Sequence, residues 1–186
     1  MKIPFKLVIL FLTIQSTITA QNYKQRYATL DVQHYKLAIA VNDTTNSIDA
    51  TMQVKLKFRK AVSEFQLDLV KKDSISGKGM VVDSIYQNNV SVTFTHTDNK
   101  LTIQPKHPFP GIEYTYTIKY HGIPKDGLVI SKNLHGDRTF FGDNWPNRAH
   151  NWFPCVDHPS DKATVEYIIE APNYYQTIAN GFQVEE

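Results

Sequence analysis

The stretch Gln33 to Phe58, QHYKLAIAVNDTTNSIDATMQVKLKF, decides the fold class of this 186-residue chain. Apolar residues recur at every second position on both sides of the turn-rich residues Asp43 to Ser47. These apolar positions are Tyr35, Leu37, Ile39 and Val41 before the turn, and Ile48, Ala50, Met52, Val54, Leu56 and Phe58 after it. A period of two is typical of strands with one buried face and one wet face. The stretch therefore predicts a β-hairpin with Lys55 and Lys57 on its outer face.

The same alternation continues along most of the remaining chain. Further apolar positions are Phe65, Leu67 and Leu69, then Val90, Val92 and Phe94, then Leu101 and Ile103, and then Tyr114, Tyr116, Ile118 and Tyr120. Two more strands are predicted over Ala163 to Glu170 and Tyr174 to Ala179, and no window has a helical period. Gly-, Pro- and Asn-containing segments between these runs supply turn chemistry. The fold class predicted is an all-β, antiparallel β-sandwich. The alternating tyrosines suit core packing better than a sugar or peptide platform.

The first residues have the pattern of a secretory signal peptide. Lys2 and Lys6 precede the apolar run Leu7 to Ile14, and small residues from Ser16 to Ala20 lead up to Gln21. The apolar run is too short to span a bilayer. We therefore expect a signal peptide over residues 1–20, cleavage near Ala20, and a secreted or periplasmic mature domain over residues 21–186.

The charge balance of the mature part excludes two classes of partner. Without Lys2 and Lys6, the 20 basic residues fall to 18 and balance the 18 acidic ones. A near-neutral domain without a Lys/Arg stripe lacks the electrostatic pattern of a protein that binds nucleic acid or an anionic membrane. The length suits a single domain. Because Asn180-Gly181 is a turn signal with only five residues after it, we expect this domain to be incomplete at its C-terminal end.

The segment Gly142 to Thr164, GDNWPNRAHNWFPCVDHPSDKAT, contains both tryptophans, three prolines and the only cysteine. Large apolar groups between rigid prolines predict a loop packed into a defined shape. Its predicted structural residues are Trp152, Phe153, Pro154, Cys155, Asp157, Pro159 and Lys162. Trp152 and Phe153 are expected to bury against the neighbouring sheet, and Cys155 to be a small buried residue without a disulfide partner. The carboxylate of Asp157 is expected to accept backbone N–H bonds in an Asx-type turn or to pair with Lys162.

A metal site in this loop is an alternative, because His150, Cys155, Asp157 and His158 are all of zinc-ligand types. Asp157 and His158 are adjacent, however, and Pro154 stiffens the approach to Cys155. A tetrahedron around one ion is therefore awkward to close, and we predict no metal site in this chain.

Residues Asn151 to Thr164, NWFPCVDHPSDKAT, resemble the WFPCxDxPxxKAT signature of the N-terminal domain in the aminopeptidase N family of zinc metallopeptidases, peptidase family M1. The resemblance implies a saddle-shaped β domain. In that family, catalysis belongs to a later domain with a GAMEN motif and an HExxH zinc site. This sequence contains neither motif: GAMEN does not occur, and no histidine is directly followed by a glutamate, as HExxH requires. The resemblance therefore implies that this chain binds no cofactor and is inactive alone, and that zinc belongs to a downstream catalytic domain of the same polypeptide, its main partner besides the peptide substrate.

The resemblance also implies where substrate is recognised. The family's first domain supplies one wall of the active-site cleft and a Gln or Glu that helps hold the substrate's free α-amino group. Counted back from Cys155, that residue falls on Trp145 and a family arginine falls on His150, so both positions depart from the pattern. Trp145 can offer only its ring face to an ammonium. Asp143, two residues earlier and beside Asn144, has the carboxylate that Trp145 lacks.

We therefore predict Asp143, Asn144 and Trp145 as substrate-binding residues, and no catalytic residue in this chain. The function predicted is the N-terminal substrate-cleft domain of a secreted zinc aminopeptidase, which removes N-terminal residues from peptides. The alternative is a non-catalytic secreted β-sandwich that binds another protein or a glycan.

Overall fold

The computed structural model describes Arg26 and residues 28–184, so the predicted signal peptide over residues 1–20 lies outside the described residues. Almost all regular structure in this part of the chain is β. The strands are β1 (Leu30–Ala40), β2 (Ile48–Phe58), β3 (Phe65–Asp68), β4 (Gly79–Gln87), β5 (Val90–Ser91), β6 (Phe94–Thr97), β7 (Lys100–Ile103), β8 (Glu113–Ile123), β9 (Leu128–Lys132), β10 (Arg138–Gly142) and β11 (Thr164–Glu170). Within the residues described, no helix has the length and apolar character needed to cross a membrane.

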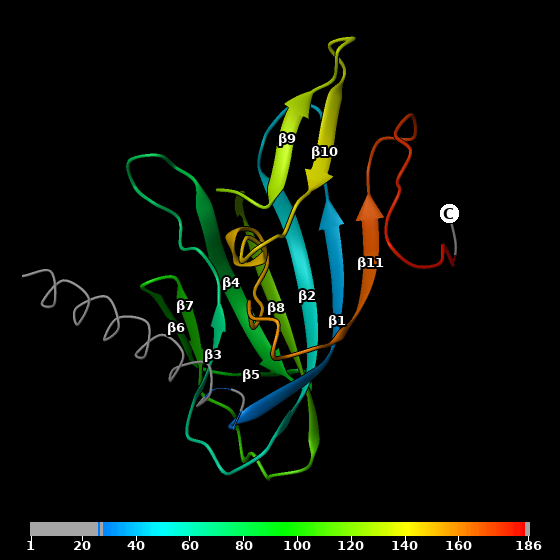
Figure 1. The fold of residues 1–186 in the computed structure, drawn as a ribbon. Helices are drawn as coiled ribbons and strands as arrows, with labels where there is room; N and C mark the ends of the chain where they lie inside the picture. Colours follow the sequence, from blue (N-terminus) through cyan, green and yellow to red (C-terminus); the bar gives the residue numbers. More distant parts are fainter. Residues whose placement is uncertain (1–25, 27, 185–186) are drawn as a thin grey trace, which may run out of the picture.

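Six of these strands form a large sheet in the order β11-β1-β2-β8-β4-β5 (Figure 1). The predicted hairpin is confirmed as β1 and β2, which pair antiparallel from Leu30 opposite Phe58 to Ala40 opposite Asp49. A register shift between Val32 and His34 accompanies an earlier start of β1 than the Gln33 predicted. All other neighbours in this sheet are antiparallel, except that β11 runs parallel to β1 at one edge.

A three-stranded sheet, in the order β3-β7-β6, packs against the inner face of the large sheet. Aromatic contacts join the two layers: the Phe65 ring of β3 lies 5.4 Å from Phe58 of β2 and 4.9 Å from Tyr116 of β8, centroid to centroid. The apolar residues of both inner faces form one buried cluster. The predicted all-β sandwich is therefore confirmed.

The tyrosines of β8 belong to this core and not to a surface platform. Tyr114, Tyr116 and Tyr120 are 8%, 0% and 2% exposed. Burial raises the pKa values of Tyr116 and Tyr120 above the ordinary range. Their side chains alternate inward along β8, as a period of two requires.

The predicted strand through Val90 and Phe94 is two strands in different sheets. Val90 begins β5, which pairs with β4 of the large sheet, and Phe94 begins β6, which pairs with β7 of the small one. Between them the chain crosses from one layer to the other: Val92 N donates to Ile85 O at 3.0 Å, and Thr93 O accepts from Gln104 N at 3.0 Å. An alternating pattern cannot reveal this change of layer, because the apolar alternation of Val90, Val92 and Phe94 continues unbroken across the crossing.

The predicted strand over Tyr174 to Ala179 was wrong. These residues join no ladder within the described chain, where β11 is the last strand. Instead, the hydroxyls of Tyr174 and Tyr175 both donate to the carboxylate of Asp43, and the Tyr175 ring packs edge-on against Phe140. Side-chain contacts hold the segment because no neighbouring strand is placed to bond its backbone.

Candidate functional site

The segment after β10 divides into two parts that differ in burial. Residues 143–148, the outer loop, are exposed or half-buried, whereas most of residues 149–157, the anchored loop, are buried. The anchored loop begins with a short 3₁₀ turn, Ala149–Asn151. The carbonyl of Ala149 accepts hydrogen bonds from Trp152 N at 3.1 Å and from Phe153 N at 3.2 Å, and these bonds turn the chain back on itself.

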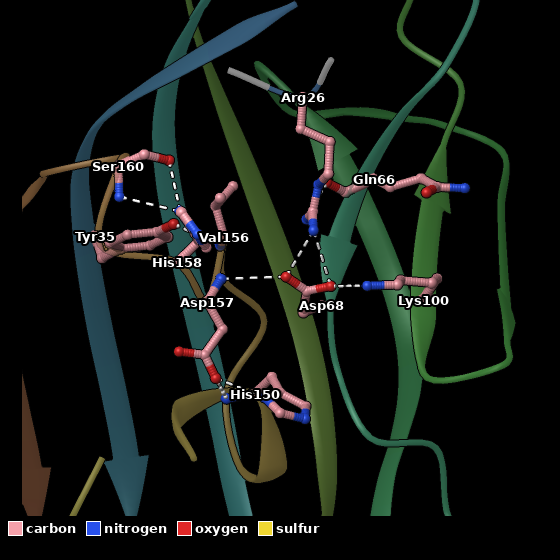
Figure 2. Close-up of polar contacts among 10 residues, drawn as sticks. All are labelled: Arg26, Tyr35, Gln66, Asp68, Lys100, His150, Val156, Asp157, His158 and Ser160. Atoms are coloured by element: carbon pink, nitrogen blue, oxygen red, sulfur yellow. Dashed lines mark hydrogen bonds and ion pairs between the residues drawn. The ribbon is translucent and has the colours of Figure 1, made fainter. Parts of the chain in front are cut away.

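Asp68, at the end of β3, ties the anchored loop to the small sheet (Figure 2). Asp68 N donates to Cys155 O at 2.7 Å, and Cys155 N donates back to Asp68 O at 3.1 Å, as in a one-residue extension of the sheet. The Asp68 side chain continues the link, because Asp157 N donates to its Oδ2 at 3.1 Å. Three hydrogen bonds therefore join one residue of the sandwich to the loop.

The charge of Asp68 is compensated although the residue is only 4% exposed. Arg26 Nη1 donates to both carboxylate oxygens, at 3.0 and 2.8 Å, and Lys100 Nζ donates to Oδ1 (Figure 2). Burial by itself raises the pKa of Asp68, but the two cations and their hydrogen bonds outweigh it, and the pKa lies below its usual value. Asp68 is therefore an ionised anchor at neutral pH.

Asp157 has a different partner from the one predicted. Its Oδ2 accepts from His150 N at 3.1 Å and lies 2.5 Å from His150 Nδ1 (Figure 2). The carboxylate accepts a backbone N–H, but the donor is seven residues upstream and not in the predicted Asx-type turn, and the side-chain partner is His150, not Lys162. His150 lies in the 3₁₀ turn, which places its backbone N–H and its imidazole next to the Asp157 carboxylate.

The aromatic residues of the anchored loop lie in the sandwich core. Trp152 is 5% exposed and Phe153 is 9% exposed, and their rings meet edge to face at 4.7 Å. Phe153 also approaches Tyr35 of β1, whose hydroxyl accepts a bond of 3.0 Å from Val156 N. Cys155 is buried, and this burial raises the pKa of its thiol. The loop thus bridges both layers of the sandwich.

The four residues of zinc-ligand type do not converge. His150 Nδ1 faces Asp157, His158 Nδ1 lies 2.7 Å from Ser160 Oγ, and Cys155 is enclosed in the core. Across Arg26 and residues 28–184, no three His, Cys, Asp or Glu side chains are grouped as metal ligands. The donors present in this part of the chain therefore do not fit a zinc ion.

Arg148 organises the outer loop. Its Nε donates to Asp126 Oδ2 at 2.8 Å, its Nη2 donates to Asp126 Oδ1, and its Nη1 donates to Asp143 Oδ2 at 2.5 Å. Hydrogen bonding to Arg148 lowers the pKa of Asp126 below its usual value. One guanidinium therefore holds two carboxylates, both of them still about two-fifths exposed.

The turn between β8 and β9 fits under the outer loop at Gly127. Asp143 N donates to Gly127 O at 2.7 Å, and Gly127 has a φ of +77°. A Cβ at this position would lie 2.2 Å from Arg148 O and 2.9 Å from Trp152 Cδ1. Only glycine combines that backbone conformation with so close an approach.

The two other predicted substrate-binding residues have different surroundings. Asn144 Oδ1 accepts from Trp152 Nε1 at 2.9 Å, so its side chain links the outer loop to the anchored loop. Trp145 is 81% exposed, and its peptide bond to Pro146 is cis. The structure thus brings Asp143, Asn144 and Trp145 together on one exposed loop. Whether they bind substrate remains a prediction.

Sequence reasoning missed several residues that build this site: Arg26, Asp68, Lys100, Asp126 and Arg148. A usable signal existed for two of them. Asp126 stands before Gly127 in a turn segment, and Arg148 is the only cation of the outer loop. Asp68 belongs to a Leu67-Asp68 pair that fits the family resemblance, but its structural role gave no such signal, because the partners of its side chain lie 42 and 32 residues away in the chain.

Comparison with known proteins gives one family and a set of related structures. The family model for the peptidase M1 N-terminal domain matches residues 31–186. No curated protein matches the sequence. The M1 zinc metallopeptidase from Deinococcus radiodurans is 27% identical with a TM-score of 0.63, over 77% of this chain and 33% of that one. A mutant of that enzyme, bound to a Tyr-Ser-Ala substrate, is 26% identical over the same shares, also with a TM-score of 0.63.

A more distant structure shows the same fold. Yeast LTA4 hydrolase in complex with bestatin is 20% identical with a TM-score of 0.70, over 86% of this chain and 25% of that one. This chain therefore spans about a third of the length of the Deinococcus enzyme and a quarter of the yeast enzyme.

Proposed function

Since the chain belongs to peptidase family M1 through its N-terminal domain, we propose that it is the substrate-cleft domain of a secreted zinc aminopeptidase that removes N-terminal residues from peptides. The related Deinococcus metallopeptidase binds a Tyr-Ser-Ala substrate, which supports a peptide as the ligand. Relatives of which this chain covers only a third or a quarter support a catalytic domain in the same polypeptide. In this proposal that domain holds the zinc, and the present chain is inactive alone.

The observation that carries the proposal is the setting of Asp143. One carboxylate oxygen accepts from Arg148, and no bond within the described residues occupies the other. The side chain is 41% exposed, and Trp145, two residues further along the same loop, has an exposed ring. A carboxylate forms charge-assisted hydrogen bonds to an ammonium, whereas an indole face offers a cation–π contact of about 0.5–2 kcal/mol. Asp143 is therefore the primary contact for the substrate's α-amino group, and Trp145 the secondary one.

Asn144 acts differently in this proposal. Its side-chain oxygen is already bonded to the Trp152 indole, which is fixed in the core. Asn144 therefore sets the position of the outer loop and does not contact the peptide.

The test uses the full-length protein and an aminoacyl arylamide with a free N-terminus. Asp143→Ala is expected to raise KM about tenfold, because a charge-assisted hydrogen bond is lost. Trp145→Ala is expected to raise KM less. Asp83→Ala is the matched control, since Asp83 is another exposed carboxylate paired with a basic side chain, His121. An unchanged KM in Asp143→Ala would overturn this role.

Two further measurements address the rest of the proposal. The isolated chain should not hydrolyse the arylamide, and zinc-dependent turnover by residues 21–186 would contradict the assignment of catalysis to another domain. Secretion is supported by Lys2, Lys6 and the apolar run that ends at Ile14. The mass of the exported protein should correspond to a chain that starts near Gln21, and retention of residues 1–20 in that protein would contradict it.

A further inference from the structure

We propose that Arg148 and Asp126 are positioning residues for substrate recognition, which fix the Asp143 carboxylate so that one of its oxygens stays free for the substrate's α-ammonium. This inference rests on the proposed function of Asp143 and goes beyond it, because neither Arg148 nor Asp126 would touch the peptide. The specificity of the outer loop then depends on the ion-pair chain of Asp126, Arg148 and Asp143 and not on one side chain.

The geometry of Arg148 supports a fixed orientation. Two of its nitrogens, Nε and Nη2, engage the two oxygens of Asp126, which is the bidentate arrangement that holds a guanidinium plane in place. The remaining nitrogen, Nη1, reaches Asp143 Oδ2 at 2.5 Å. The direction of the Asp143 carboxylate therefore depends on the pairing between Arg148 and Asp126.

The backbone reinforces this arrangement from both sides. Asp143 N donates to Gly127 O, one residue after Asp126. The same turn therefore holds the backbone of Asp143 directly and its side chain through Arg148. Arg148 O accepts from Asn151 N at 3.2 Å and from Asn151 Nδ2 at 3.0 Å, and Asn151 is buried. A continuous series of bonds thus runs from the buried core to the exposed carboxylate.

The charges explain why Asp126 matters. A guanidinium next to Asp143 would repel an incoming ammonium if it were compensated by Asp143 alone. Asp126 offsets that charge, so the two carboxylates and one guanidinium leave a net charge of about −1 for the ligand. Removing the charge of Asp126 should therefore weaken ammonium binding, even though Asp126 makes no contact with the peptide.

The experiment measures KM, kcat and the inhibition constant of an amino acid amide with the full-length enzyme. Asp126→Asn and Arg148→Lys are each expected to raise KM and the inhibition constant about three- to tenfold, with kcat changed less than twofold, because a bidentate or charge-assisted contact is lost. Arg59→Lys is the matched control, since Arg59 forms an exposed ion pair with Asp31 at 2.9 Å.

A double-mutant cycle separates a positioning role from a structural one. If Arg148 acts through Asp143, Arg148→Lys will add no further increase in KM in the Asp143→Ala background. Should Asp143→Ala raise KM while Asp126→Asn and Arg148→Lys leave it unchanged, this inference is overturned and the proposed function stands. Loss of thermal stability or of kcat without a change in KM would also overturn it. An unchanged KM in Asp143→Ala removes the proposed role of Asp143 itself.

Discussion

The outer loop and the anchored loop are adjacent in the chain, yet they are held by different means. The anchored loop has buried aromatic rings and three hydrogen bonds to Asp68 of the small sheet. The outer loop depends on the ion pairs of Arg148 and one bond between Asn144 and Trp152. The signature residues Trp152 to Asp157 lie in the anchored loop, whereas of the two departures from the family pattern Trp145 lies in the outer loop and His150 in the anchored one. Packing in the core therefore fixes most of the anchored loop, while the exposed Trp145 has no such constraint.

The largest effect is expected from Asp68→Asn, which removes the charge that holds the anchored loop to the small sheet. We expect a loss of about 3 kcal/mol in the free energy of unfolding, because Arg26 and Lys100 would lose a buried partner. Urea unfolding at pH 7 measures it, with Asp83→Asn as the exposed control. Equal urea midpoints for the wild type and Asp68→Asn would contradict the stabilising role of Asp68.

The same variant has a pH signature. The pKa of Asp68 is lowered in the folded state, so its stabilising contribution is fully present above the unfolded value of about 3.9 and is lost as the pH falls through the lower folded value. The difference in stability between wild type and Asp68→Asn should therefore be largest near neutral pH and should shrink below about pH 4.

Gly127→Ala tests the contact between the outer loop and the turn beneath it. We expect a loss of about 2–3 kcal/mol, since the new Cβ would meet Arg148 O at a residue with positive φ. Gly111→Ala is the matched control: Gly111 has a φ of +80° with open space around it, so only the conformational cost of about 1 kcal/mol is expected. Similar losses in both variants would show that the close approach is unimportant.

Trp152→Phe tests the bond that joins the two loops. The phenyl ring keeps most of the packing but cannot donate to Asn144, and we expect a loss of about 1 kcal/mol. A thermal unfolding cycle with Asn144→Ala measures the coupling between these residues. Strictly additive losses would argue against the link.

The smallest effect is expected for Trp145→Ala. Because this side chain is 81% exposed, stability should change by less than about 0.5 kcal/mol, in contrast to the core residue Trp152. Thermal unfolding measures it. A loss above about 1 kcal/mol would mean that the outer loop belongs to the folded core after all.

The sequence predicted the parts of the fold where alternation is uninterrupted. The hairpin of β1 and β2 is the example, with one face buried along most of its length. Strand β4 was missed because a register shift between Val82 and Ser84 breaks its period. The strands β9 and β10 were also missed, since both are short and none of their residues is buried. The segment from Tyr174 was assigned wrongly because alternation does not show whether a neighbouring strand exists.

The site was less predictable than the fold. The proline- and tryptophan-rich segment indicated a loop packed into a defined shape, in agreement with the burial of Trp152 and Phe153, whereas the substrate-binding role of its three candidate residues stays a prediction. The ion pairs that shape it could not be foreseen, because Arg26 and Asp68, or Asp126 and Arg148, are distant in the chain and meet only after the sheets have formed. The pairing of these charges depends on tertiary structure, whereas strand patterns depend on local sequence.

The bridge between Asp68 and Cys155 also covers part of a sheet edge. Strand β3 lies at the edge of the small sheet, and an open edge presents backbone groups to which a strand of another molecule can bond. At Asp68 both backbone groups are taken by Cys155, and the inward carboxylate would disfavour an approaching apolar strand. The anchored loop thereby also shields this edge from intermolecular pairing, so variants that detach it should aggregate before they unfold completely.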